Sequence, residues 1–164
     1  MGKLNRSDLI AAMADGLREI SGLGVLHSQA LAARLGISGS DLECFDYVLM
    51  RGPMTAGELA RATGLTTGAI TGIVDRLERA ALVRRKQDPS DRRKVVVEVP
   101  PAVQRRVTPL GEPMQKAMLT VLNKYDNDEL QLLLDFVRSA REASLGAIAT
   151  LKASPRIPNT RKVT

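Results

Sequence analysis

The basic residues between Arg76 and Lys94 carry the clearest chemical signal in this chain of 164 residues. Over this stretch the basic side chains outnumber the acidic ones, Glu78, Asp88 and Asp91. The basic residues are Arg76, Arg79, Arg84, Arg85, Lys86, Arg92, Arg93 and Lys94. A local surplus of positive charge neutralizes the phosphates of DNA. A solvated charged surface is the alternative interpretation, and the elements that carry these residues favour DNA.

The first of these elements is a helix-turn-helix pattern that begins at Thr55. Thr55-x-x-Glu58 predicts a capping box at the start of one helix, and Gly64 follows that helix where a tight turn needs a positive φ. Beyond the turn, apolar residues recur at the spacing of a helical stripe: Ile70, Ile73, Val74 and Leu77. The stripe predicts a second helix whose opposite face is exposed. That face carries Gly68, Thr71, Gly72, Asp75 and Arg79, with Arg76 beside it.

The exposed face of this second helix has the residue types that read DNA. A threonine at its start caps the helix, so that its first amides can meet a phosphate. Two glycines within a helix cost about 1 kcal/mol each relative to Ala, which indicates either close approach to DNA or simple tolerance at a surface. Thr71 can contact a base edge, and Arg76 can reach a phosphate or a guanine. The DNA-binding residues predicted here are Thr66, Thr67, Gly68, Thr71, Gly72 and Arg76.

The second element is a basic hairpin that follows the helices directly. Residues 82–86 and 94–99 are strand-like, and the second run is closed by Pro100-Pro101, which cannot continue a ladder. Between them, Asp88-Pro-Ser-Asp-Arg-Arg-Lys94 supplies turn residues at the tip. A helix-turn-helix followed by a basic hairpin predicts a winged helix on DNA.

From about residue 38 to residue 111 the chain resembles the multiple antibiotic resistance regulator (MarR) family of bacterial winged-helix transcription factors. The resemblance is carried by Leu59-Ala60, Leu65, Ile70-Thr71, Val74-Asp75-Arg76-Leu77-Glu78, Leu82-Val83-x-Arg85, Asp88 to Lys94, and Val107-Thr108-Pro109-Leu110-Gly111. The Asp-x-Arg pattern within the hairpin is its most specific part. Two positions depart from the family, because Gly72 stands where many members have Arg and Ala81 replaces a Gly. One family contact to DNA is therefore expected to be missing, and the geometry of the helix end is expected to change.

The resemblance also assigns roles at the tip of the hairpin. It implies that Arg93 enters the minor groove of DNA and that Asp91 orients the tip. Arg92 and Lys94 are expected to meet the phosphate backbone.

Apolar residues spaced three and four apart predict helices built for self-association toward both ends of the chain. They are Ile10, Met13, Leu17 and Ile20, then Met114, Met118, Val121 and Tyr125, and finally Leu134, Val137, Arg141, Ser144, Ile148 and Leu151. Capping boxes are expected at Asp126-x-x-Glu129 and at Ser40-x-x-Glu43, the latter opening the helix that carries Phe45. An intramolecular bundle is the alternative, and the family resemblance implies a two-fold dimer.

The predicted fold class is mainly α with a small β-hairpin wing, as a winged helix-turn-helix with N- and C-terminal dimerization helices. Four segments are expected. They are an N-terminal dimerization helix region (1–36), the winged DNA-binding domain (37–107), C-terminal dimerization helices (108–152) and a basic mobile tail (153–164).

Composition agrees with this interpretation and excludes other classes. The chain is 44% hydrophobic and 26% charged with a single Cys, which suits a globular protein in a reducing compartment and excludes a disulfide framework. No apolar run is long enough for a membrane span, so a cytoplasmic, nucleoid-associated protein is expected. His27 is the only His and is interpreted as a packing residue or a satisfied polar group rather than a switch. Without a second His or a Cys cluster, no metal site is predicted. No catalytic arrangement or cofactor motif is visible, and an enzyme is not expected.

The expected function is a sequence-specific transcriptional regulator that binds a pseudo-palindromic operator as a homodimer, with half-sites about 34 Å apart. The resemblance implies a repressor that is released by a small organic effector, often aromatic or anionic, bound where the dimerization helices meet the winged domain. An activator and a ligand-blind repressor remain open. Two alternatives are a nonspecific architectural DNA-binding protein and a redox-responsive regulator based on Cys44.

Overall fold

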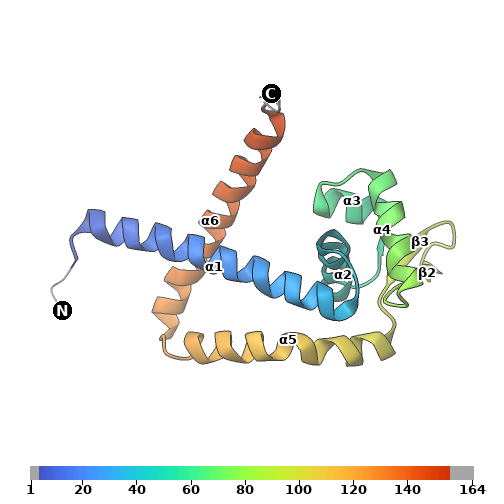
Figure 1. Ribbon diagram of the computed structural model, residues 1–164, viewed down its shortest axis with the longest axis horizontal. Coiled ribbons are helices and arrows are strands. Elements are labelled where there is room, and N and C mark those ends of the chain that lie inside the picture. The colour runs from blue at the N-terminus through green and yellow to red at the C-terminus, as the bar shows by residue number, and fades with distance from the viewer. Residues whose placement is uncertain (1–3, 156–164) are drawn as a thin grey trace, which may run out of the picture. The chain divides into compact units, whose positions relative to one another are not determined.

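The computed structural model describes residues 4–155, which form helices and one small antiparallel sheet (Figure 1). The elements are α1 (Arg6–Leu35), α2 (Gly39–Arg51), β1 (Met54–Thr55), α3 (Ala56–Thr63), α4 (Thr67–Arg79), β2 (Arg84–Gln87), β3 (Val95–Glu98), α5 (Pro101–Leu122) and α6 (Asn127–Ala153). The chain divides into two compact units within α5, after Gly111. The mainly helical fold with a small wing is confirmed. Most of the predicted basic tail, from residue 156 onward, lies outside the described residues.

One hydrophobic core holds the first unit together. The stripe predicted on α4 is buried in full, and Phe45 of α2 and Leu59 of α3 pack into the same cluster. The last turns of α1 join it through buried Ala32 and partly buried Leu31 and Leu35. The core therefore extends N-terminally past residue 37, where the winged domain was expected to begin.

The wing is part of a three-stranded sheet with the order β1-β3-β2. Strands β2 and β3 form the predicted hairpin, in which Arg84 pairs with Glu98 and Gln87 pairs with Val95. Strand β1 adds to the other edge of β3 and was not predicted, because two residues are too few to show a strand period. Through β1, the hairpin is connected by backbone hydrogen bonds to the start of α3.

Three of the four predicted helix starts have the expected caps. Thr55 with Glu58 and Asp126 with Glu129 form capping boxes, and Thr66 caps α4. Gly64 ends α3 with φ of 70°, in the left-handed region that the turn requires.

The box predicted at Ser40 and Glu43 is wrong. The cap of α2 is Ser38, whose Oγ accepts from the Asp41 amide at 3.2 Å, while the Asp41 carboxylate accepts from the Ser38 amide at 3.4 Å. Both serines have an acidic residue three positions later, so sequence alone leaves two overlapping possibilities. The tertiary ion pair that Asp41 forms with Arg76 distinguishes them.

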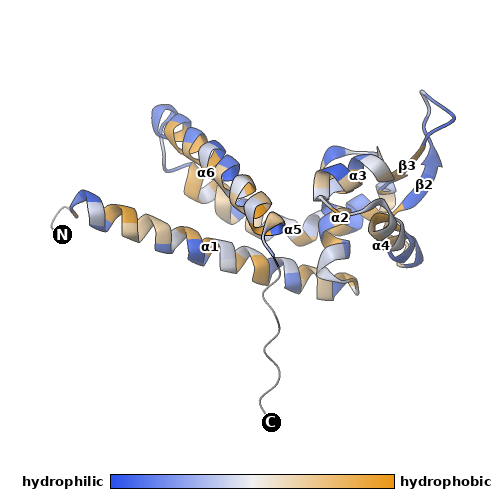
Figure 2. Ribbon diagram, turned by 90° about the horizontal axis from the view of Figure 1, so that it is seen from above, coloured by the Kyte–Doolittle hydropathy of each residue, from blue (hydrophilic) through white to orange (hydrophobic). Residues whose placement is uncertain are grey.

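The helices toward the two ends of the chain carry exposed apolar residues, which Figure 2 colours orange. No residue of α6 is buried, and in α1 the only buried residue is Ala32 near its C-terminal end. The exposed apolar residues that occupy the predicted three-and-four seams are Ile10, Met13, Leu17 and Ile20 of α1, Met114, Met118 and Val121 of α5, and Leu134, Val137, Ile148 and Leu151 of α6. Others, such as Leu9 and Leu26 of α1 and Leu145 of α6, lie outside those seams.

Candidate nucleic-acid interface

Helix α4 begins with an open, uncharged end that suits a phosphate. The Thr66 side chain accepts from the amide of Ala69 at 3.2 Å, and no acidic residue lies in the first turn. Thr67, Gly68 and Thr71 follow on the exposed surface. The positive end of the helix dipole and its free amides therefore face solvent, where a DNA phosphate can approach.

The two glycines of α4 are not required by packing within the protein. A Cβ on Gly68 would meet nothing within 4 Å, and one on Gly72 would meet only Nη1 of Arg76, at 3.7 Å. The Thr71 hydroxyl donates to the carbonyl of Thr67 at 3.0 Å, which holds this side chain against its own helix. The first two turns of α4 therefore present a shallow surface.

Arg76 has a structural role that the sequence analysis did not foresee. Its Nε lies 3.1 Å from both carboxylate oxygens of Asp41, and its Nη2 lies 2.6 Å from Oδ1. Burial raises the pKa of Asp41, but hydrogen bonds from Arg76 and Ser38 outweigh burial and leave that pKa below its usual value. Arg76 thus ties α4 to the start of α2, and only Nη1 takes no part in the pair. The pair with Asp41 therefore adds a structural role to the DNA contact predicted for Arg76.

Much of the remaining positive charge of this stretch is also neutralized within the winged unit. Arg85 pairs with Asp75 at 2.7 Å and with Glu78, and its amide donates to Glu78 at 2.7 Å. Arg84 pairs with Glu98 at 2.5 Å. Lys86 lies farther from the same carboxylate, at 3.8 Å. These pairs attach strand β2 to α4 and to β3, so the basic stretch is partly a structural feature.

The tip of the wing is arranged by two aspartates. Oδ1 of Asp88 accepts from the amides of Ser90, at 2.7 Å, and of Asp91, at 3.2 Å. Hydrogen bonds from the hydroxyl and amide of Ser90 hold the pKa of Asp88 below its usual value. Oδ1 of Asp91 accepts from the amide and from Nε of Arg93, at 3.1 and 3.3 Å.

The basic residues of the tip remain turned to solvent. The Arg93 side chain is 92% exposed although it contacts Asp91. Lys94 is a looser neighbour of Asp91 at 3.8 Å, and Arg92 is exposed. The structure therefore brings Asp91 and Arg93 together as the resemblance implied, with a guanidinium held at the end of a projecting hairpin.

The residue that joins α4 to the wing is under backbone strain. Ala81 has φ of 54°, and it is the one non-glycine residue with a positive φ in the described range 4–155. A Cβ disfavours this conformation. This explains why glycine is usual at this position in the family that the chain resembles. The effect is local, since the Ala81 and Leu82 amides still donate to the end of α4, at 2.9 and 3.0 Å.

Outside the winged surface, the sequence analysis considered a redox-active Cys44 and a role for His27. Cys44 is fully buried, and burial, with the charges of Glu43 and Asp41, raises the pKa of its thiol to about 11. Within residues 4–155 no group of His, Cys, Asp and Glu side chains is placed to hold a metal ion. In the same range no helix is both long and apolar enough to cross a membrane. His27 is half-buried on α1.

Sequence reasoning missed two parts of this interface: the anchoring residue Asp41 and strand β1. Asp41 is a buried charge that lies 35 positions before its partner Arg76 in the chain. A serine three residues before an acidic residue was the only available signal for it, and the chain has two such pairs side by side.

Comparison with known proteins gives matches over both the winged segment and the whole chain. The family model described as MarR family matches residues 48–95. The chain is 37% identical over 148 residues to the uncharacterized HTH-type transcriptional regulator YcgE of Bacillus subtilis (strain 168), covering 90% of this chain and 96% of that one. It is also 48% identical over 48 residues to the HTH-type transcriptional repressor NicR of Pseudomonas putida, which is 29% of this chain and 30% of NicR.

The solved structures agree with the fold. A MarR family protein from Bacillus stearothermophilus superposes with a TM-score of 0.62 at 21% identity, over 87% of this chain and 99% of that one.

Proposed function

From the premise that this chain belongs to the MarR family of helix-turn-helix transcriptional regulators, we propose that it is a repressor acting as a homodimer on a pseudo-palindromic operator. The observation that carries the proposal is the pairing of an exposed, shallow α4 surface with an exposed arginine at the tip of the wing. Such a pair suits two neighbouring grooves of DNA. The proposed place of action is the cytoplasm, at the nucleoid.

We assign the residues of this surface to two kinds of contact. We assign base reading to Thr71, which lies on a surface where Gly68 and Gly72 contribute no side chains. We assign phosphate contacts to the start of α4, at Thr66 and Thr67.

The wing adds a minor-groove contact by Arg93, which Asp91 orients, and backbone contacts by Arg92 and Lys94. Arg76 acts mainly as a positioning residue, because its pair with Asp41 fixes α4 on the winged unit. Nη1 remains available for a phosphate.

Two copies of the winged unit are proposed to be joined through the terminal helices. The exposed apolar stripes of α1 and α6 are longer than a monomeric protein usually leaves in water. A second copy supplies the same stripes, so a two-fold arrangement covers both at once. It also places two α4 helices on one face of DNA, with half-sites about 34 Å apart.

The proposed repression is relieved by a small molecule. NicR, which is named a repressor, shares 48% identity with this chain over a segment of 48 residues. A small organic effector is proposed to release the operator by binding more tightly to an arrangement of the dimer that does not fit DNA.

Selection from a pool of random duplexes by the full chain tests the proposal. A regulator enriches a motif with two inverted halves centred about one helical turn apart. A nonspecific architectural protein enriches no motif and binds all duplexes with the same salt dependence. The second outcome refutes the operator and leaves only general DNA binding.

Thr71→Ala adds a residue-level control to that selection. Loss of a base contact lowers the ratio of operator to random-duplex affinity by about 1 kcal/mol or more per half-site, with nearly unchanged salt dependence. Thr63→Ala is the matched control, because Thr63 lies in α3 and its hydroxyl is engaged by the Leu59 carbonyl at 2.9 Å. An equal loss in the two variants contradicts base reading by Thr71.

A further inference from the structure

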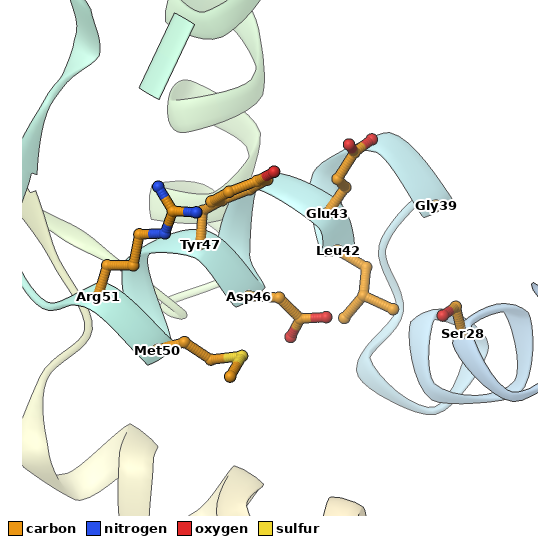
Figure 3. Close-up of a pocket in the computed structure, with 8 residues that line it drawn as sticks. All are labelled: Ser28, Gly39, Leu42, Glu43, Asp46, Tyr47, Met50 and Arg51. Carbon is orange, nitrogen blue, oxygen red and sulfur yellow. The ribbon is translucent and has the colours of Figure 1, made fainter. Parts of the chain in front are cut away.

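A pocket of about 500 Å³ lies between the C-terminal part of α1 and one face of α2 (Figure 3). It belongs wholly to the first unit of the chain. Its volume falls in the range that holds small organic molecules. Its lining includes Ser28, Leu42, Glu43, Asp46, Met50 and Arg51.

The pocket combines apolar walls with acidic groups. Leu42 forms part of the buried core, while Met50 is 85% exposed at the rim. Asp46 directs its carboxylate between these two side chains, as Figure 3 shows. Glu43 lies one turn earlier on the same face of α2.

The one cationic side chain in the lining, Arg51, contacts another lining residue, Tyr47. The guanidinium of Arg51 lies over the ring of Tyr47, 4.8 Å from its centroid, in a cation–π contact. Among the described residues Arg51 forms no ion pair with Asp46 or Glu43. The net charge of the lining is negative, because the two carboxylates of Glu43 and Asp46 outnumber the one guanidinium.

Asp46 is a half-buried carboxylate near His27. No ion pair joins it to another residue of the described chain. Burial raises the pKa of the Asp46 carboxyl, and the nearby charge of His27 lowers that pKa by a smaller amount. A partly desolvated carboxylate gains most from a positive group that also excludes water, and it disfavours a second negative charge.

We propose that this pocket binds a small organic cation, with an ammonium group paired to Asp46 and an apolar body held between Leu42 and Met50. The hydroxyl of Ser28 is a further acceptor for the same ammonium group. This differs from the aromatic or anionic effector implied by the family resemblance, because an anion placed here meets two carboxylates. Binding itself needs no DNA; only its regulatory consequence rests on the proposed function.

Three probes of the same size but different charge test the proposal with the full chain. Benzylamine is a cation near neutral pH, benzyl alcohol is neutral and benzoate is an anion. Titration calorimetry of each probe, without DNA, is expected to rank benzylamine first by at least about fivefold, and benzoate last. Tighter binding of benzoate, or no binding of benzylamine at about 10 mM, overturns the proposal.

The variant Asp46→Asn keeps the shape of the side chain and removes its charge. Benzylamine affinity is expected to fall at least about fivefold, while benzyl alcohol affinity stays within about twofold. Glu142→Gln removes a carboxylate of α6 outside the lining and is the matched control. Thermal melts of both variants confirm that each remains folded. Unchanged benzylamine affinity in Asp46→Asn, or an equal loss in Glu142→Gln, overturns the assignment.

Operator binding is measured separately, so that the two proposals fail independently. Benzylamine that binds through Asp46 but leaves operator affinity unchanged supports the pocket and contradicts regulation through it. Selection that yields no inverted motif contradicts the operator, while the calorimetry still decides the ligand.

Discussion

Helices α4 and α6 both carry an apolar stripe, and the structure surrounds the two stripes differently. Ile70, Ile73, Val74 and Leu77 of α4 are at most 4% exposed. The residues of the α6 stripe are 43–76% exposed at Leu134, Val137, Ile148 and Leu151. The same periodicity therefore predicts two helices correctly but does not say whether the chain itself or another copy covers the apolar face.

The polar contacts of these helices differ in the same way. α4 is held to other elements by the pair of Arg76 with Asp41 and by the contacts of Asp75 and Glu78 with Arg85. In the described part of α6, the ion pair is local, between Arg138 and Asp135 on the same helix. Helix α4 is thus anchored by apolar and polar contacts together, as the proposed reading surface requires. The proposed dimer supplies a partner for the exposed stripe of α6.

The largest expected effect comes from truncating the buried stripe. Leu77→Ala is expected to lower the free energy of unfolding by about 2–5 kcal/mol, because it leaves a cavity in the core. Leu151→Ala, on the 76% exposed side chain, is the control and is expected to cost under about 1 kcal/mol when unfolding is measured at protein concentrations that keep the chain monomeric. Urea unfolding followed by circular dichroism measures both. Equal losses at the two positions contradict the contrast between the stripes.

Charges on the α6 stripe test the interface. The double variant Val137→Asp with Ile148→Asp is expected to raise the dimer dissociation constant by about 100-fold or more, since each carboxylate loses water in the interface. The helical signal of the chain is expected to persist. Sedimentation velocity over a concentration series gives the measurement. A control, Arg138→Asp, changes a residue that is absent from the predicted seam. A double variant that remains dimeric contradicts an interface through the α6 stripe, and a parent chain that is monomeric favours an intramolecular bundle.

Arg93→Ala compares two kinds of arginine in the winged unit, those held in ion pairs and those that project into solvent. Loss of the exposed guanidinium is expected to weaken operator binding and to reduce the slope of log affinity against log salt by about 1 per lost contact. Arg84→Ala is the matched control, because Arg84 is held by Glu98. Titrations at several salt concentrations measure both slopes. An unchanged slope for Arg93→Ala contradicts a DNA contact by Arg93 and favours an ordinary solvated loop.

The end of α4 offers a smaller, stabilizing change. Ala81→Gly is expected to raise the free energy of unfolding by about 0.5–1 kcal/mol, because glycine relieves the positive φ while adding freedom to the unfolded chain. The exposed Ala80, which has φ of −78°, supplies the control, since Ala80→Gly is expected to destabilize. Chemical denaturation shows whether each substitution raises or lowers the free energy of unfolding. A lower free energy of unfolding in Ala81→Gly contradicts backbone strain at Ala81.

The smallest expected effect concerns Cys44, the residue of the redox alternative. Its thiol is buried and has a pKa raised to about 11, so the reactive thiolate is scarce at pH 8. Alkylation by iodoacetamide is expected to be slow in the native protein and complete in urea, as followed by mass spectrometry. Treatment with peroxide is expected to leave operator affinity unchanged. Rapid native alkylation together with loss of the operator supports the redox-responsive regulator instead.

Local chemistry explains what was predictable in the candidate site. The cap at Thr66, the turn at Gly64 and the tip at Asp91 and Arg93 depend on neighbours within a few residues, and each is found where the pattern placed it. The ion pair of Arg76 with Asp41 was not predicted, because the two residues lie 35 positions apart in the chain.

The sequence by itself determined the helices, the wing and the family, because helical periodicity, capping and turn chemistry are written within a few residues of each other. Tertiary structure decided which charges are neutralized, which of two serines caps α2, and that a two-residue strand at Met54 completes the sheet. It also brought Ser28 of α1 beside the acidic face of α2, which forms the pocket. The physical reason is that ion pairs, strand pairing and cavities join residues distant in the chain, and no local pattern records those partners.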